Sequence, residues 1–214
     1  MSSRLAALAR AAPPQAPPEA AAACDMCAAP LPAAHRHLLD LETRALMCAC
    51  RACALLFDRD AAGGGHYTLV PERVRLVADF DLDDADWDEL LIPVDMAFFY
   101  RDSRAGRTVA MYPGPMGATE SQLTLDAWDE LEAANPVVRM LRADVEALLV
   151  NRARGAREHY LVPLDVCFEL VGLMRTRWKG LGGGPELWAA LDDFFDELRR
   201  RAGPVSRTGG GELT

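Results

Sequence analysis

The sequence predicts an α+β fold: an antiparallel sheet of four or more strands with three to four covering helices, preceded by an N-terminal treble-clef-like zinc-binding unit. Three observations lead to this prediction. Two pairs of apolar segments are each joined by a short polar turn, which is typical of β-hairpins. Apolar residues then recur at helical spacing toward the C-terminal end. Five of the six cysteines lie between Cys24 and Cys53, in a spacing typical of metal ligands.

The composition is that of a globular protein and argues against two classes of function. Apolar residues make up 50% of the 214 residues and charged residues 26%. No run approaches the ~18 uninterrupted apolar residues of a membrane span. The 32 acidic residues outnumber the 23 basic ones, which gives a net charge of −9. Proteins that bind nucleic acid usually carry a basic face, so we expect no nucleic-acid partner.

The chain divides into four segments. We expect a disordered Ala/Pro-rich tail over residues 1–23, a four-cysteine zinc-binding unit over 24–62, an α+β domain over 63–202 and a second disordered tail over 203–214. The first tail has a basic start but lacks the continuous apolar stretch of about 7–15 residues that a secretory signal needs. Paired prolines in this tail interrupt any helix before it can pack.

The first part of the α+β domain combines short strands with an acidic segment. Apolar residues recur at short intervals over 66–80, which predicts one or two short strands. Seven of the eleven residues over 79–89 are acidic. Within this segment Asp83 or Asp84 can cap a short helix that carries Trp87. A calcium loop is the alternative, but the glycine and the distal glutamate of that motif are absent.

The middle of the domain predicts a hairpin, a loop and a helix. Apolar and aromatic residues over 91–100 and 108–113 flank a polar turn, so these two segments predict paired strands. The Gly- and Pro-rich segment 112–121 predicts a loop. A helix is expected to begin at Thr124 or Asp126.

The last part predicts a second hairpin followed by two helices. Segments 146–152 and 158–163 flank a short polar turn. From Leu164 onward the apolar residues follow a helical spacing. The final segment, 185–201, is amphipathic, begins with a proline and ends with three arginines, which suits the two ends of a helix dipole.

The cysteine cluster predicts a tetrahedral metal site. Cys24 and Cys27 form one pair, and Cys50 and Cys53 form a second pair after 22 residues (28–49). Two residues between the thiolates let both sulfurs of a tight turn face one ion, and two such pairs supply the four ligands of a structural zinc. The predicted order is a turn with the first pair, a hairpin around Glu42-Thr43 and a helix that carries the second pair. This order of elements is that of a treble-clef finger.

Other uses of these cysteines remain open. Iron is the main alternative to zinc, because rubredoxin also uses two such pairs and the series from Cys48 to Cys53 can hold an iron–sulfur cluster. Disulfides and buried free thiols are two further alternatives. Cys48, His35 and His37 are possible extra or alternative ligands, although histidines at such positions are more often surface groups.

A second candidate site lies at the tip of the later hairpin. Arg152, Arg154 and Arg157 surround the turn and His159 follows it, which suits an anion, carboxylate or partner-binding clamp with a proton-transfer group. The alternative is a solvated turn whose arginines pair with the acidic segment 79–89.

The usual enzyme motifs are absent from the sequence. It contains no G-x-S-x-G, no Walker A motif and no H-E-x-x-H. The sixth cysteine, Cys167, is flanked by Val166 and Phe168 and is expected in the core. We therefore expect a protein that is not an enzyme and carries no catalytic residues. A small hydrolase built around His159 is the least supported alternative.

Five stretches carry a resemblance to a known family: HRHLLDLETRALMCACRACALLFDR, IPVDMAFFY, YPGPMGATES, LVNRARGAREHYLVPLD and LVGLMRTRWKGL. Together they span about residues 24–200 and resemble an actinobacterial family of uncharacterised proteins, a domain of unknown function encoded beside high-affinity [NiFe]-hydrogenase genes. The resemblance supplies no catalytic residues. It implies a cytoplasmic location and an accessory role.

Two functional hypotheses follow from the residues and the resemblance together. The first is a non-enzymatic accessory protein with a structural four-cysteine zinc site that binds a protein partner, such as a [NiFe]-hydrogenase subunit or a maturation factor. The second is a redox or metal-handling protein whose cysteine cluster carries rubredoxin-like iron or an Fe–S cluster.

Overall fold

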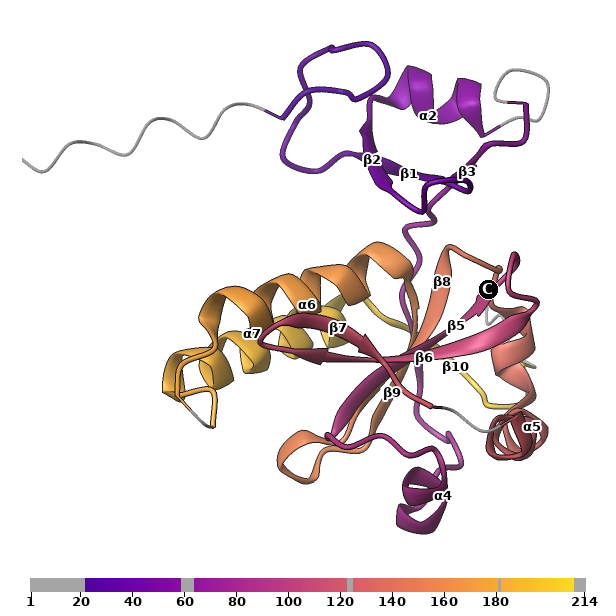
Figure 1. The fold of residues 1–214 in the computed structure, drawn as a ribbon, viewed down its shortest axis with the longest axis vertical. Helices are drawn as coiled ribbons and strands as arrows, with labels where there is room; N and C mark the ends of the chain where they lie inside the picture. The colour runs from indigo at the N-terminus through magenta and orange to yellow at the C-terminus, as the bar shows by residue number, and fades with distance from the viewer. Residues whose placement is uncertain (1–21, 59–63, 123–124, 181, 210–214) are drawn as a thin grey trace, which may run out of the picture.

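The computed structural model describes residues 22–58, 64–122, 125–180 and 182–209. These residues form a three-stranded sheet in the order β2-β1-β3 and a seven-stranded sheet in the order β10-β4-β9-β8-β5-β6-β7. The small sheet and one helix form an N-terminal unit above the larger domain (Figure 1). The α+β class and the antiparallel sheet of several strands are thus confirmed.

The N-terminal unit consists of β1 (Arg36–Asp40), β2 (Leu46–Ala49), α2 (Arg51–Phe57) and β3 (Tyr67–Leu69). Strands β1 and β2 are antiparallel and form the expected hairpin around Glu42-Thr43. Asp40 stabilises the turn of this hairpin, because its carboxylate accepts hydrogen bonds from the backbone N–H groups of Glu42 and Thr43 at 2.8 and 2.9 Å. An aspartate that bonds backbone N–H groups two or three residues ahead is a common turn device.

The larger domain contains seven strands, four α-helices and two short 3-10 helices among the described residues. The strands are β4 (Arg75–Val77), β5 (Met96–Asp102), β6 (Arg107–Gly114), β7 (Gly117–Glu120), β8 (Glu146–Asn151), β9 (Glu158–Pro163) and β10 (Gly203–Val205). The helices are α4 (Asp84–Glu89), α5 (Leu125–Ala134), η1 (Pro136–Met140), η2 (Ala153–Gly155), α6 (Leu164–Arg177) and α7 (Pro185–Arg201).

Helices cover both faces of the seven-stranded sheet, with α6 and α7 on one face and α4 and α5 on the other (Figure 1). Successive strand residues point to opposite faces, so Phe98 packs with α6 and α7 while Phe99 packs with Trp128 of α5. Every residue of β8 is buried. This two-sided burial explains why the central strands read as continuous apolar runs.

Both expected hairpins of this domain are present. Strand β5 pairs antiparallel with β6, and β8 pairs antiparallel with β9. The predicted cap of α4 is also present: the Asp83 carboxylate accepts the N–H of Asp86 at 2.9 Å, and the Asp86 carboxylate accepts the N–H of Asp83 at 3.0 Å. This reciprocal arrangement is a capping box.

Segment 112–121 differs from its prediction as a loop. It turns tightly at residues 114–117, so that β7 returns along β6. Pro113 lies inside β6 opposite Ala118. The proline and glycine residues of the segment led to the prediction of a loop, because both residue types are rare inside strands. Position 117 requires a glycine, because its φ of 122° is unfavourable for residues with a side chain.

The C-terminal segment also differs from the expected tail over 203–214. Gly203–Val205 form β10, which runs parallel to β4. Asp79 then holds the following residues by accepting the N–H of Arg207 at 2.8 Å and the hydroxyl of Ser206 at 2.8 Å. The segment is therefore ordered through residue 209, while residues 210–214 lie outside the described residues, as do residues 1–21 of the expected tail over 1–23.

Candidate metal centre

Four cysteine sulfurs converge in the N-terminal unit. The four sulfurs all lie within 4.8 Å of one another, and they belong to Cys24, Cys27, Cys50 and Cys53. Cys27 Sγ and Cys50 Sγ are 3.8 Å apart. The described cysteines are all free thiols, so the disulfide alternative is not what the structure shows.

A tight turn positions the first pair. The Cys24 N–H donates to the carbonyl of Ala29, and the Ala28 N–H donates back to the carbonyl of Cys24, both at 2.8 Å. Asp25 ties this turn to β2 through two bonds: its N–H donates to the carbonyl of Cys48 at 2.9 Å, and its carboxylate accepts the Cys48 N–H at 2.6 Å. The turn is thereby fixed against the strand that leads to the second pair.

The start of α2 positions the second pair. Cys50 is the N-cap residue of this helix, and its sulfur accepts the N–H of Cys53 at 3.5 Å. Helix N-termini carry partial positive charge, which stabilises thiolates. Cys24 and Cys53 are buried against a small apolar cluster that includes Leu31, Leu38 and Ala54.

The four thiols differ in their readiness to ionise. Burial would raise the pKa of Cys24, but backbone hydrogen bonds at Cys50, Met26 and Cys27 lower it to about 6. Burial and the neighbouring sulfurs raise the pKa of Cys53 to about 12. A cluster in which one sulfur ionises and another resists is expected where four thiolates would repel one another, and a cation removes that repulsion.

His35, His37 and Cys48 form a separate cluster. One ligand atom from each lies within 4.8 Å of the other two. His37 and Cys48 are directly opposite each other across β1 and β2. The structure therefore groups these three residues with one another and apart from the four cysteines. Cys48 lies within β2, which ends at Ala49, whereas Cys50 belongs to the cap of α2.

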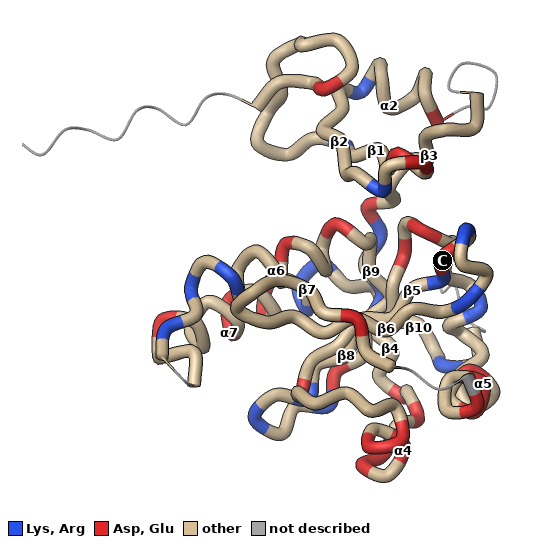
Figure 2. Tube along the Cα trace, in the orientation of Figure 1, with Lys and Arg blue, Asp and Glu red and all other residues tan. Residues whose placement is uncertain are grey.

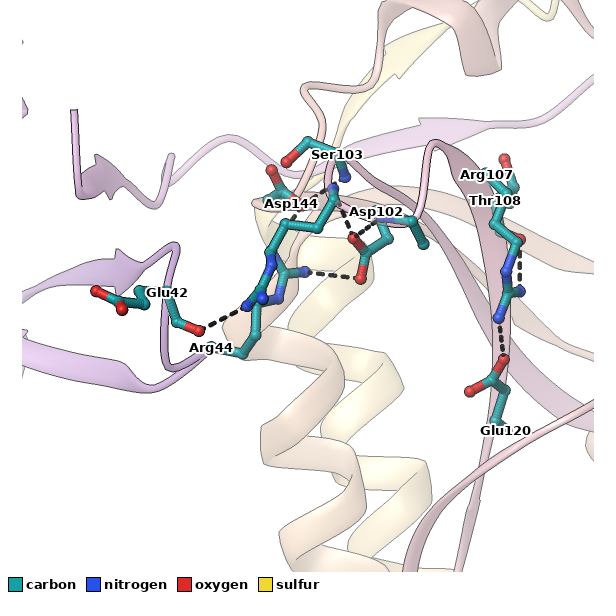
Figure 3. Close-up of polar contacts among 10 residues, drawn as sticks. Glu42, Arg44, Asp102, Ser103, Arg107, Thr108, Glu120 and Asp144 are labelled. Carbon is teal, nitrogen blue, oxygen red and sulfur yellow. Dashed lines mark hydrogen bonds and ion pairs between the residues drawn. The ribbon is translucent and has the colours of Figure 1, made fainter.

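Ion pairs join the N-terminal unit to the larger domain (Figure 3), and Leu39 of β1 packs with Val145 of the larger domain. Arg44 donates to Asp144 at 2.7 Å and lies 3.6 Å from Asp102. Burial would raise the pKa of Asp144, but hydrogen bonds from Ser103 and Arg44 lower it. Arg104 adds a bond to the backbone carbonyl of Glu42 at 2.7 Å. Sequence reasoning missed this joint, because its partners lie far apart along the chain.

The arginines at the turn between β8 and β9 have partners within the chain. Arg152 is buried and bonds to Asp84, while its guanidinium also lies 5.2 Å from the ring centre of Trp87. Arg157 donates to the same Asp84 at 2.6 Å. Arg154 lies over Trp188 at 4.9 Å. Acidic residues gather on α4 beside this turn (Figure 2), and the expected pairing with segment 79–89 occurs for Arg152 and Arg157, whereas Arg154 pairs with Asp192 of α7.

His159 does not reach an open surface. It is buried and stacks on Phe80 with 4.5 Å between the ring centres. Burial, together with the charges of Arg152 and Arg157, lowers its pKa to about 4. A neutral imidazole enclosed in this way suits packing better than the anion clamp or the proton transfer that the sequence suggested. Cys167 is fully buried in the core, as expected.

Sequence reasoning missed Asp165, the acidic residue in the first turn of α6. Its carboxylate is 2.7 Å from Nδ1 of His37, a residue 128 positions earlier. The hydrogen bond to Asp165 raises the pKa of His37, although burial alone would lower it. No local pattern signals such a contact, since it depends on how the two parts of the chain pack.

Comparisons with known proteins identify a family and no function. None of the helices within the described ranges is long and apolar enough to cross a membrane. No curated protein and no solved structure matches the chain. Residues 23–202, which include both clusters and all but the last strand, match a family of unknown function, DUF5947. The chain therefore belongs to the DUF5947 family.

Proposed function

We propose that Cys24, Cys27, Cys50 and Cys53 bind one structural Zn²⁺ ion. The distance between Cys27 Sγ and Cys50 Sγ, 3.8 Å, is the observation that carries this proposal. Zinc–sulfur bonds of about 2.3 Å in a tetrahedron require sulfur–sulfur distances of about 3.8 Å. Cys27 and Cys50 are therefore spaced for a tetrahedral ion rather than for a disulfide, whose sulfurs lie about 2.05 Å apart, and all four sulfurs lie within 4.8 Å of one another.

The surrounding elements support a structural role for this ion. The order of turn, hairpin and helix, with Cys50 as the helix cap, is that of a treble-clef finger. Four sulfurs close the coordination shell and leave no open position for a substrate. The small apolar cluster around Cys24 and Cys53 contains only six buried residues, so the ion supplies much of the stability of this unit.

The protein then acts as a non-enzymatic accessory protein that binds another protein in the cytoplasm. Helix α2 supports this role, because Leu55 and Leu56 beside the zinc ligands are 56% and 53% exposed. Large apolar side chains that remain exposed next to each other are typical of contact surfaces. The resemblance noted above makes a [NiFe]-hydrogenase subunit or a maturation factor the expected partner.

Two measurements test this proposal. Purified protein should be colourless and contain zinc in the tetrathiolate site, and Cys27→Ser should lose that zinc. A red-brown protein with visible absorbance would instead indicate iron, and the redox or metal-handling function would replace the structural one.

The partner is tested by affinity capture from the native host. We expect the wild-type chain to recover hydrogenase subunits or maturation factors, and a variant with Leu55→Ser and Leu56→Ser to recover less of them. Met116→Ser is a matched control, since Met116 is 93% exposed but belongs to the turn between β6 and β7. Repeated absence of hydrogenase proteins with the wild-type chain would contradict this partner.

A further inference from the structure

The cluster of His35, His37 and Cys48 has the geometry of a metal site in its own right. His37 and Cys48 face each other across β1 and β2, and directly opposed residues of antiparallel strands have Cβ atoms about 4.5–5.5 Å apart. His35 precedes His37 by two residues, and its ring centre lies 4.9 Å from that of His37. Two imidazoles and one thiol therefore meet on one face of the hairpin.

Both imidazoles are oriented as metal ligands are. Nδ1 of His35 is 3.0 Å from the carbonyl oxygen of Pro32, an acceptor only, so this nitrogen carries the proton. Nδ1 of His37 is 2.7 Å from the carboxylate of Asp165. With Nδ1 donating in each ring, Nε2 is the nitrogen left to bind a metal. A carboxylate or carbonyl behind a histidine is the usual outer support of a metal ligand.

One of these nitrogens has nothing to bond to in the protein. Nε2 of His35 is buried and has no hydrogen-bond partner among the described residues. A buried polar atom without a partner costs free energy, and a bound cation is one way in which proteins remove that cost. This orphaned atom is an observation independent of the spacing of the three residues.

We propose that His35, His37 and Cys48 bind a second Zn²⁺ ion, through Nε2 of each histidine and the sulfur of Cys48. Two nitrogens and one sulfur suit this borderline-soft ion. Unlike the tetrathiolate, this site supplies three protein ligands. Three ligands leave one coordination position, which in zinc proteins is taken by water or by another small molecule.

The surroundings leave room for that fourth ligand. The three residues line an open cavity of about 620 Å³, together with Asp165, Glu169 and other residues. This volume is within the range of small-molecule sites. The carboxylate of Glu169 and the open solvent both offer oxygen ligands. The tetrathiolate, by contrast, is closed by its own sulfurs.

The second site also lies where the two parts of the protein meet. His35, His37 and Cys48 belong to the N-terminal unit, whereas Asp165 belongs to α6 of the larger domain. Because Asp165 orients His37, binding of the ion and docking of the unit on α6 favour each other. The site requires the N-terminal unit to be folded, so it rests on the structural zinc proposed above.

Zinc stoichiometry of the full chain tests the proposal. The protein is equilibrated with excess zinc, passed through a desalting column, and its zinc content is measured by mass spectrometry together with its far-UV circular dichroism. We expect two zinc ions per chain in the wild type and one in the His35→Ala/His37→Ala variant. His66→Ala is the matched control, because it removes an exposed imidazole outside the cluster and should keep two ions.

A second variant covers the case in which the double substitution disturbs folding. Asp165→Asn keeps all three ligands but weakens the support behind His37, and loss of such a support typically lowers metal affinity 10–100-fold. In a chelator competition we expect one of the two ions to be lost 10–100-fold more readily from this variant, with the other unchanged.

The outcomes separate this proposal from the structural zinc. One zinc per chain in the wild type, lost in Cys27→Ser but kept in His35→Ala/His37→Ala, would overturn the second site and leave the first. No zinc in the wild type would overturn both. Two zinc ions in a folded His35→Ala/His37→Ala variant, or unchanged affinity in Asp165→Asn, would overturn the assignment of these ligands.

Discussion

The buried His159 makes the stability of the protein depend on pH between neutrality and about pH 4. This histidine lies in β9 against Phe80, and burial followed by the charges of Arg152 and Arg157 lowers its pKa to about 4. In the unfolded chain the pKa of a histidine is about 6.5. Between these two values the unfolded state binds a proton that the folded state does not, so acidification favours unfolding.

The size of this effect follows from the two pKa values. With a folded value of about 4, His159 contributes almost nothing to the pH dependence above pH 7. Lowering the pH from 7 to 5 then reduces the free energy of unfolding by about 2 kcal/mol through this group alone. The loss approaches its full value, about 3 kcal/mol, only below pH 4, where the folded state also binds the proton.

Urea denaturation followed by tryptophan fluorescence measures this contribution. The wild type is compared with His159→Phe, which keeps a ring on Phe80 but cannot bind a proton. We expect the free energy of unfolding to fall by about 2 kcal/mol more in the wild type than in the variant between pH 7 and pH 5. Other titrating groups are common to both proteins and cancel in this difference.

A control and a refuting result define the test. His66→Phe removes an exposed histidine and should show the same pH dependence as the wild type. If wild type and His159→Phe lose the same stability between pH 7 and pH 5, the histidine either accepts its proton in the folded state or is not enclosed, and the reasoning is wrong.

Three further predictions concern the metal, the arginines and the buried thiol. A strong chelator should unfold the N-terminal unit, since structural zinc contributes about 10–16 kcal/mol in small fingers, while amide exchange in β8 and β9 stays slow. Arg152→Ala should lower the free energy of unfolding by about 2 kcal/mol, because carbonyls at Leu82 and Asp83 lose their donor. Arg154→Ala, at an exposed ion pair, should cost less than about 1 kcal/mol by the same chemical denaturation. Cys167 should resist alkylation in the native protein and react only after unfolding, as mass spectrometry would show, because burial raises the pKa of its thiol.

Local patterns in the sequence were sufficient for most individual elements. The hairpins β5-β6 and β8-β9 follow from apolar runs around a polar turn, and α7 begins at Pro185 and ends at Arg201 as its pattern indicates. The grouping of Cys24 and Cys27 with Cys50 and Cys53 also follows from spacing alone. In each case the physical cause acts over a few residues, or through a ligand spacing that a metal imposes.

What the sequence did not predict depends on contacts between distant segments. Strand β4 pairs with β9, more than 80 residues later, and no local pattern specifies that register. The same holds for the bond between His37 and Asp165 and for that between Arg44 and Asp144. Segment 112–121 failed for a different reason, because its glycines and prolines lower strand propensity although the β6-β7 pairing tolerates them.

The short strand β10 has a practical consequence for anyone who shortens this chain. It occupies the outer side of β4, where it satisfies backbone groups that would otherwise be unpaired. The family match ends at residue 202, one residue before this strand. A protein cut at that boundary would present β4 as a bare edge, and bare edges recruit strands from other molecules. Self-association of such a truncated protein would therefore reflect a missing strand rather than a natural oligomer.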